Sequence, residues 1–328
     1  MIIVYNYTHA MTNILRLDKQ SPHPRSLSQR ERDDEKALSC TPRPLGEACL
    51  PVRQGLGVRV IIAALFLFFS FSSAFGNAFL ESVVKDGIGV RPLGMGGAFV
   101  AVSDDGNSIY YNPAALADSK TQYIRGYMDM NSDVYIRNDC YTVTMPQAGW
   151  GYWNRQDKLG NKADVTAFSF GTKGQNAVAW GVTYKNISWD TGGSQARGWT
   201  MDGGLKASFS KEMAVGILVQ DLLKNSAPIS SSLRMGIAIS PQIVPDTVFA
   251  VDSEFRNLKS AKGADIYMRY GAETKITETL VVRGGWDRER FSGGVTAVFP
   301  YITADYAVIV NADRENTQMF GFRFSDAP

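Results

Sequence analysis

The chain has 328 residues, of which 45% are hydrophobic and 20% charged, and its formal net charge is +2. These values permit one globular domain, two small domains or a membrane barrel. The near balance of basic and acidic residues argues against a nucleic-acid-binding protein.

Residues 1–57 show no hydrophobic period. The stretch HPRSLSQRERDDEKALSCTPRPLGEA is polar, and it lies where the short basic region of a signal peptide is expected to begin the chain. Val58 is a candidate for the true initiator, because a GTG start codon reads as valine in a translation that begins further upstream. We therefore predict that residues 1–57 are a non-structural extension or result from a misassigned start.

Residues 58–74 have the pattern of a secretory signal peptide. Arg59 precedes a nearly uncharged apolar run, and Ser72 and Ala74 form a small-residue cleavage pair. A transmembrane anchor is the alternative, but crossing a bilayer takes about 20 apolar residues and no positive stop-transfer cluster follows. The exported chain keeps one cysteine, Cys140, and no histidine, which excludes an internal disulfide and histidine-based catalysis.

Residues 75–118 hold the glycine-rich stretch RPLGMGGAFVAVSDDGNSIYYNPAAL. A dinucleotide-binding fingerprint needs a third glycine where this chain has Phe99, and no Gly-Lys-Ser/Thr follows. The stretch therefore does not predict a phosphate-binding loop. Gly94, Gly96 and Gly97 predict sharp bends and close packing, and Asn112-Pro113 predicts a turn that ends a short helix-like run.

Residues 119–328 consist of short runs in which apolar and polar residues alternate. Such a period of two is typical of β-strands with two different faces. We predict fourteen strands, at 121–128, 139–145, 148–154, 163–171, 177–187, 198–209, 212–221, 232–240, 247–254, 265–274, 279–286, 291–299, 301–308 and 317–324.

The connections between these runs alternate between short turns and mostly longer loops. Pro146-Gln147, for example, is short, whereas SWDTGGSQAR at 188–197 is expected to be a long loop. An even number of strands with short turns at one end is typical of a bacterial outer-membrane barrel. We expect both termini to lie at the short-turn, periplasmic end.

Charged residues occupy the strand phase opposite the large apolar residues. A lipid-facing arginine near the membrane midplane costs about 2 to 4 kcal/mol, so these charges are expected to point into the lumen. Asp221 is an exception, because it shares a phase with apolar residues; we expect it to lie at a strand end. The predicted lumen charges are Arg234, Asp252, Glu254, Arg269, Glu273, Arg283, Asp305 and Arg323.

A soluble all-β sandwich or barrel is the alternative, since its strands alternate in the same way. The export signal and the unequal loop lengths argue against it. Aromatic residues near the run ends, among them Trp150, Trp199 and Tyr301, also suit the interfacial girdles of a membrane barrel.

The segment from Gly89 to Asp105, followed by Tyr111-Asn112-Pro113-Ala114, resembles the amino-terminal signature of the long-chain fatty acid transporter (FadL-type) outer-membrane superfamily, most closely its PorV/PorQ branch. The resemblance extends loosely to the GFRF sequence at 321–324. It implies an all-β, fourteen-stranded transmembrane barrel, residues 119–328, whose amino-terminal segment, residues 75–118, folds into the lumen as a hatch. Gly94, Gly96, Gly97, Asn112 and Pro113 then form the hatch backbone.

Two functions follow from this resemblance. The first is passive passage or binding of hydrophobic small molecules across the outer membrane, with outer-membrane lipid around the barrel. The candidate ligand contacts are Leu93, Met95, Phe99, Ile109, Tyr110 and Tyr111. The alternative is a PorV-like role in type IX secretion or cargo docking, in which secretion-system proteins are the partners. We expect no enzyme activity, no cofactor and no metal; the spacing of the nearby aspartates matches no calcium loop.

Overall fold

The computed structural model describes residues 77–86, 88–128, 135–174, 178–257, 264–288, 290–311 and 316–325. The predicted extension and signal peptide lie outside these ranges. The described chain begins with short helices: α4 (Ala78–Lys85), α5 (Val90–Gly94), α6 (Ser108–Tyr111) and the 3-10 helix η1 (Pro113–Asp118). None of the helices in the described ranges has the length and hydrophobicity needed to cross a membrane.

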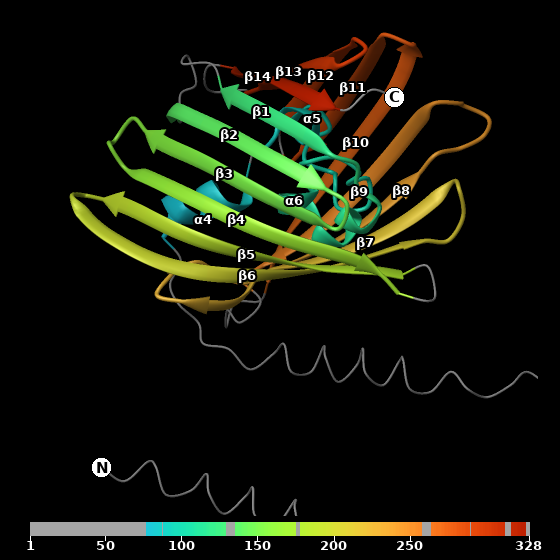
Figure 1. Cartoon of the computed structure of the whole chain (residues 1–328). Coiled ribbons are helices and arrows are strands. Elements are labelled where there is room, and N and C mark those ends of the chain that lie inside the picture. The colour runs from blue at the N-terminus through green and yellow to red at the C-terminus, as the bar shows by residue number, and fades with distance from the viewer. Residues whose placement is uncertain are drawn as a thin grey trace, which may run out of the picture. The chain divides into compact units, whose positions relative to one another are not determined.

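Fourteen strands follow and form a closed antiparallel barrel, in which each strand pairs with its sequence neighbours and β1 pairs with β14 (Figure 1). This confirms the predicted fold, and each predicted run falls on one observed strand. The strands are β1 (Gln122–Met128), β2 (Tyr135–Met145), β3 (Ala148–Asp157), β4 (Lys162–Lys173), β5 (Val178–Thr191), β6 (Ser194–Ser208), β7 (Met213–Asn225), β8 (Ser232–Ile239), β9 (Thr247–Arg256), β10 (Asp265–Thr277), β11 (Leu280–Asp287), β12 (Arg290–Val298), β13 (Ile302–Val310) and β14 (Thr317–Ser325).

The connection between β5 and β6 differs from the prediction. The expected long loop over 188–197 is instead strand on both sides of a two-residue turn, Gly192-Gly193, and Thr191 pairs with Ser194. Both glycines have positive φ, 62° and 81°, as a tight hairpin turn of the primed type requires. The turn signal lay in the sequence, and the polar residues beside it belong to strands.

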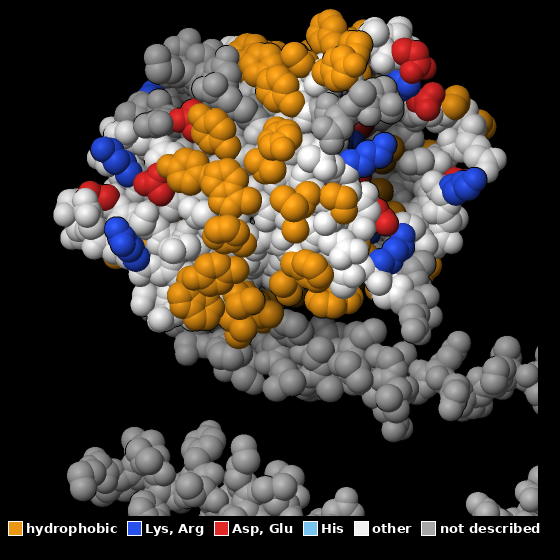
Figure 2. Space-filling view, in the orientation of Figure 1, with side chains coloured by type: hydrophobic (Ala, Val, Ile, Leu, Met, Phe, Trp, Pro, Cys, Tyr) orange, Lys and Arg blue, Asp and Glu red, His pale blue; other side chains and the backbone are white. Residues whose placement is uncertain are grey.

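The outer surface of the barrel is apolar. Figure 2 shows hydrophobic side chains gathered across the visible face, with charged side chains mostly toward its two margins. Large exposed residues such as Phe168, Trp180, Ile237, Phe249 and Tyr270 come from strands all around the barrel. A soluble protein buries its apolar face, so the soluble alternative is wrong and the surface is that of a membrane barrel.

The described part of the amino-terminal segment, residues 77–86 and 88–118, which we call the hatch, runs through the lumen. We call the barrel end that holds the β3–β4, β5–β6 and β7–β8 connections the loop end, and the opposite end the turn end. At the loop end, the backbone N–H of Asn77 donates to Pro228 O, 2.8 Å away. At the turn end, Ser119 Oγ donates to Met145 O at 2.8 Å.

This path corrects the expected position of the termini. The strand β14 ends at the turn end, where Ser325 pairs with Gln122, as predicted. The first described residue, Asn77, lies at the loop end instead. In Figure 1 the helix α4 accordingly lies near one end of the barrel and α6 toward the other.

Candidate functional site

The hatch approaches the barrel wall most closely at its glycines. Gly96 and Gly97 have φ values of 62° and 76°, which side chains other than glycine rarely adopt. A Cβ atom on Gly96 would also lie 2.5 Å from the backbone nitrogen of Trp286. Gly94 has an ordinary φ, but a Cβ there would lie 2.7 Å from Cδ of Arg283. All three predicted hatch glycines thus lie against the lumen wall.

The barrel wall also has glycines where it contacts the hatch. At each of these positions a Cβ atom would lie between 2.2 and 2.9 Å from a hatch atom, so any side chain there would collide with the hatch. We call them the wall glycines, and the strand pattern alone had not assigned them a role. They are Gly149, Gly151, Gly171, Gly181, Gly204, Gly216, Gly271 and Gly285.

Asn112 and Pro113 hold the turn-end part of the hatch in place. The Asn112 side chain caps η1 by accepting from the backbone N–H of Ala114 at 3.2 Å. Its Nδ2 donates to Val100 O at 3.0 Å and to Leu205 O at 2.9 Å, which joins two hatch segments to β6. Pro113 lies against the wall glycines Gly171, Gly181 and Gly204. The two residues therefore fix the hatch to β4, β5 and β6.

The six candidate ligand contacts are all buried in this conformation. Leu93 packs in a small cluster with Val90, Ala307 and Met319, and the other five belong to the main apolar cluster. Phe99 and Tyr111 form an edge-to-face pair with ring centroids 5.4 Å apart, and Tyr110 and Trp153 form one at 4.6 Å. The structure therefore brings Met95, Phe99, Ile109, Tyr110 and Tyr111 together but leaves them closed to solvent.

The predicted lumen charges lie inside the barrel and form two networks with the hatch. The first is centred on Arg91 of α5, which binds both carboxylate oxygens of Glu273, at 2.8 and 2.7 Å. Arg283 lies opposite Glu273 in the register and also binds Asp305, which in turn binds Arg323. The hatch residue Asp105 lies 3.1 Å from Arg91.

The second network is centred on Glu254, which is fully buried. Arg234 lies opposite it in the register, 3.1 Å away, and Arg256 binds its other oxygen at 2.7 Å. Arg269 pairs with Glu254 and with Asp287. The hatch contributes Asp86, which lies 2.6 Å from Arg256 and also pairs with Arg288 and Arg269.

The eighth predicted charge, Asp252, binds the hatch backbone directly. Its Oδ2 accepts hydrogen bonds from the N–H groups of Phe99 and Val100, at 2.9 and 3.0 Å. The side chain is fully buried, and its other oxygen has no hydrogen-bond partner in the described part of the chain. Asp252 therefore acts as a fixed acceptor at mid-lumen that positions the hatch loop.

A third ionic cluster surrounds Lys185 and was not predicted. Lys185 lies 2.8 Å from Asp202 and 2.7 Å from Asp221, and all three side chains are buried. The expectation that Asp221 lies at a strand end is therefore wrong, because β7 continues to Asn225. A bulge between β6 and β7, with Asp221 at a φ of 55°, turns its carboxylate into the lumen.

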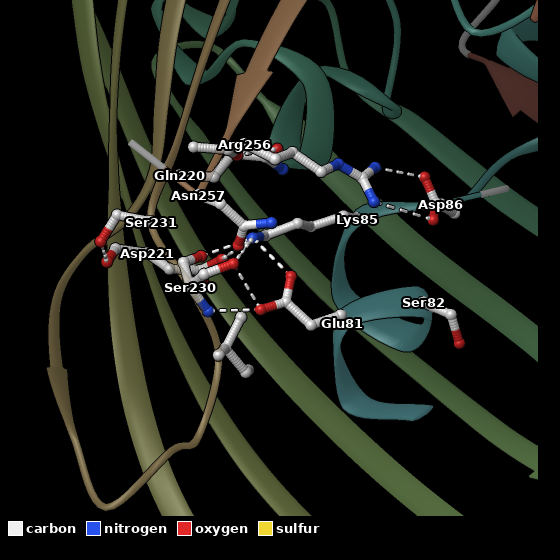
Figure 3. Close-up of polar contacts among 12 residues, drawn as sticks. Glu81, Ser82, Lys85, Asp86, Gln220, Asp221, Ser230, Ser231, Arg256 and Asn257 are labelled. Atoms are coloured by element: carbon white, nitrogen blue, oxygen red, sulfur yellow. Dashed lines mark hydrogen bonds and ion pairs between the residues drawn. The ribbon is translucent and has the colours of Figure 1, made fainter. Parts of the chain in front are cut away.

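The helix α4 connects this cluster to the second network, as Figure 3 shows. Lys85 pairs with Glu81 on α4 at 2.7 Å, lies 3.9 Å from Asp221, and donates to Ser230 O. The next residue, Asp86, faces Arg256 of β9, Arg269 of β10 and Arg288, which follows β11. Consecutive residues of opposite charge thus hold the end of α4 between two sides of the barrel.

The pKa values of the hatch groups follow from this burial and pairing. Burial favours the neutral form of Asp86, but the Arg256, Arg288 and Arg269 guanidiniums outweigh it and hold its pKa below the usual range. Burial also disfavours the charged form of Arg91, but Asp104, Glu273 and Asp105 together raise its pKa well above the usual value. Burial raises the pKa of Tyr111 to about 12. Asp86 and Arg91 are therefore charged, and Tyr111 is neutral, near neutral pH.

Sequence reasoning missed several charged residues of these networks, among them Glu81, Lys85, Asp86, Arg91, Lys185 and Asp202. Lys185 lies in the strand phase opposite Trp180, Val182 and Tyr184, so its inward direction is readable from the sequence. The pairing of Lys185 with Asp202 and Asp221 was not readable, because it depends on the bulge in β7. In the described ranges no group of three or more His, Cys, Asp or Glu side chains is placed to hold a metal ion.

The fold is a closed fourteen-stranded barrel with an apolar outer belt and a hatch in its lumen, which places this chain among membrane barrels with an internal hatch. Among solved structures, the toluene transporter TodX of Pseudomonas putida is similar, with a TM-score of 0.54 and 10% identity over 74% of this chain and 100% of that chain. A TodX deltaS2S3 mutant, a monoaromatic hydrocarbon channel, has a TM-score of 0.52 and 12% identity over 74% and 99%.

A FadL homologue of Pseudomonas aeruginosa is also similar, with a TM-score of 0.48 and 9% identity over 71% of this chain and 97% of that one. A comparison with models of protein families finds no match, and neither does a comparison with curated proteins. At these identities the similarity establishes the fold alone: this chain has a TodX-type barrel.

Proposed function

We propose that this protein is an outer-membrane barrel that binds hydrophobic small molecules or lets them pass. The observation that carries the proposal is the apolar character of the lumen toward the loop end. There the inward side chains of β3, β4 and β5 include Trp153, Val165, Ile187 and Trp189, all buried in one cluster with the hatch. The lumen of a porin is polar and filled with water, so this lining favours apolar ligands.

The outer-membrane location rests on the outer surface and the placement of the charges. Large apolar side chains surround the barrel, while the eight predicted lumen charges lie inside it, seven in ion pairs and Asp252 bound to the hatch backbone. The predicted signal peptide at 58–74 supplies the export that such a location requires. The similarity to TodX supports the same class of membrane barrel through its fold.

Passage requires the hatch to move. The hatch residues Met95, Phe99 and Ile109 are fully buried, and the wall glycines fit the hatch closely. A packed core of this kind has discrete arrangements and does not deform continuously. We therefore infer that a ligand passes after part of the hatch has left its position.

Vesicles with lipopolysaccharide in the outer leaflet offer a direct test, because this leaflet slows the entry of apolar solutes. Purified protein is inserted, and the initial uptake of labelled toluene or n-octane is measured against a polar sugar. A variant with Asn77→Cys and Pro228→Cys provides the control, since the Asn77 N–H and the Pro228 oxygen are 2.8 Å apart and a disulfide there ties the hatch to the wall.

We expect faster uptake of the apolar solutes than in vesicles without protein, and no faster uptake of the sugar. Oxidation of the double-cysteine variant is expected to reduce apolar uptake to the level of protein-free vesicles, and reduction is expected to restore the faster uptake. Apolar uptake equal to that of protein-free vesicles contradicts the proposal.

A PorV-like role in secretion or cargo docking is the second candidate function. The closed packing of the hatch favours it, because docking requires no passage through the lumen. Affinity purification of the tagged protein from its own outer membranes discriminates between the two roles. A defined protein partner recovered in stoichiometric amount, together with no apolar uptake, favours docking.

A further inference from the structure

We propose that α4 occupies a ligand site of the barrel, and that the ligand is an apolar molecule with one hydrogen-bond-accepting oxygen at its end. This inference rests on the proposed function and names a site within it. The site lies at the loop end of the lumen, where α4 now stands. It differs from the contacts predicted from the sequence, which all lie deeper in the hatch.

The apolar part of the site is a row of inward side chains on adjacent strands. Trp153 of β3 is paired in the register with Val165 of β4, and Val165 is paired with Ile187 of β5. Trp189 and Ala163 form the neighbouring row. All of these side chains are buried, together with Ala227 and Ile229 of the β7–β8 connection. We call this surface the α4 cradle.

Three side chains of α4 fill the cradle. Leu80, Val83 and Val84 are at most 2% exposed, whereas Ala78 on the same helix is exposed. A molecule with an apolar body of about the size of these three side chains would satisfy the same surface.

Two hydrogen-bond donors at one edge of the cradle give the site its polarity. Trp153 Nε1 donates to the backbone oxygen of Val83 at 3.2 Å, and the Arg155 guanidinium donates to that of Ser82 at 2.6 Å. Arg155 also donates to Asn138 Oδ1, which holds its position independently of α4. Without α4, Trp153 Nε1 and the Arg155 Nη1 that donates to Ser82 face the vacated space, and a buried donor favours a ligand that accepts from it. A single carbonyl or carboxylate oxygen meets this requirement.

The helix α4 is suited to undock from the cradle. It has eight residues, and isolated helices shorter than about 12 to 15 residues are marginal in water. Its own hydrogen bonds are therefore stable only while it is docked. The ion pairs of Lys85 and Asp86 and the bonds of Glu81 to Ser230 hold it against the wall. Ligand and helix compete for one cradle, so the apparent affinity depends on how often the helix is undocked.

Fluorine NMR on the full chain in lipid nanodiscs tests this competition. Tryptophan is replaced by fluorotryptophan, and the Trp153 and Trp189 resonances are assigned by substitution of each to Phe. Methyl heptyl ketone is the probe, and n-nonane is the matched molecule without oxygen. The ketone is expected to shift both resonances with saturation, and n-nonane is expected to bind more weakly.

Two double variants, each replacing one leucine and one valine by alanine, distinguish an effect in the cradle from an effect elsewhere in the hatch. Leu80→Ala with Val83→Ala removes the side chains that fill the cradle, and the dissociation constant for the ketone is expected to fall about tenfold or more. Val90→Ala with Leu93→Ala makes the same deletions in the second apolar cluster of the hatch. That variant is expected to keep the wild-type affinity.

The Asn77→Cys and Pro228→Cys variant provides a switch within one protein. Both of its redox states lack the Asn77 side chain that caps α4, so the comparison isolates the tether. Oxidation is expected to abolish the ketone-dependent shifts and reduction to restore them. Undiminished shifts in the oxidised state, or an equal gain of affinity in both double variants, overturn the site. Equal binding of n-nonane overturns the requirement for an acceptor.

Vesicle uptake and the tryptophan resonances together distinguish a failure of the cradle from a failure of the proposed function. Apolar uptake into vesicles without saturable shifts at Trp153 and Trp189 leaves passage intact and rejects the cradle. Saturable ketone binding at both tryptophans without any uptake supports the cradle and rejects passage.

Discussion

Gly285 of β11 and Gly96 of the hatch meet backbone against backbone, so that a Cβ atom on Gly285 would lie 2.2 Å from the nitrogen of Gly96. We predict that Gly285→Ala forces the hatch from the wall and lowers the free energy of unfolding by about 1 to 3 kcal/mol. Urea unfolding of the barrel in lipid vesicles measures this change.

The neighbouring Gly284 provides the matched control. A Cβ atom there would meet only Ser292 O, at 3.9 Å, which is an ordinary contact. Gly284→Ala is therefore expected to change the free energy of unfolding by less than about 0.5 kcal/mol. Equal effects of the two substitutions would show that hatch contact is not the cause.

The buried Lys185 is predicted to be essential to the stability of the wall near the β7 bulge. Lys185→Met leaves the Asp202 and Asp221 carboxylates buried without their shared cation, and breaking a buried pair costs about 3 to 5 kcal/mol. Lys173→Met is the control, because its pair with Asp118 is exposed and such pairs contribute about 0 to 1 kcal/mol. Comparable unfolding midpoints for the two variants would contradict the prediction.

Acid is predicted to loosen α4. The pKa of Asp86 in the docked hatch lies below its ordinary value of 3.8. A lowered pKa stabilises docking fully above the ordinary value, and this contribution is lost as the pH falls through the docked pKa. Hydrogen exchange of the α4 amides, corrected for intrinsic rates, is expected to lose protection below about pH 4.

Asp86→Asn tests the source of this pH dependence. The variant lacks the titrating carboxylate, so its α4 protection is expected to be lower than in wild type at neutral pH. Its protection is also expected to change less between neutral and acid pH. A wild-type-like acid response in this variant would assign the effect to other groups.

The path of the hatch predicts which end of it faces the cell exterior. Ala78 is exposed on α4 at the loop end, and Lys120 is exposed just before β1 at the turn end. Outer-membrane barrels place their longer loops outside, so Ala78→Cys is expected to react with a membrane-impermeant maleimide on intact cells. Lys120→Cys is expected to react only after the cells are opened, and the reverse pattern would invert the orientation.

The strand pattern predicted the barrel because lipid imposes one simple rule on each strand. Alternation of apolar and charged residues such as Tyr270 and Arg269 reports which face meets lipid, and this rule holds strand by strand. The β5–β6 hairpin was predicted as a long loop because the strand residues next to its turn are polar on the outer face. Gly192-Gly193 was the better signal for its turn.

The interior was less predictable, since it depends on contacts between segments far apart in the sequence. The glycines of the hatch were recognised, but their partners on the wall, such as Gly271 and Gly285, become visible only when β10 and β11 are adjacent. Asp221 was misplaced because one bulge reverses the direction of its side chain, and a period of two cannot reveal a bulge. The direction in which the hatch crosses the lumen likewise left no trace in the sequence pattern.

The hatch crosses the whole lumen before β1 begins, and β14 closes the ring by pairing with β1. If the ring closed first, α4 would have to pass the wall glycines, through a space that the hatch already fits closely. Biogenesis is simpler if the sheet curls around a segment already in place. The amino-terminal stretch then serves as an internal template, and the last strand joins the first only after the interior has been wrapped.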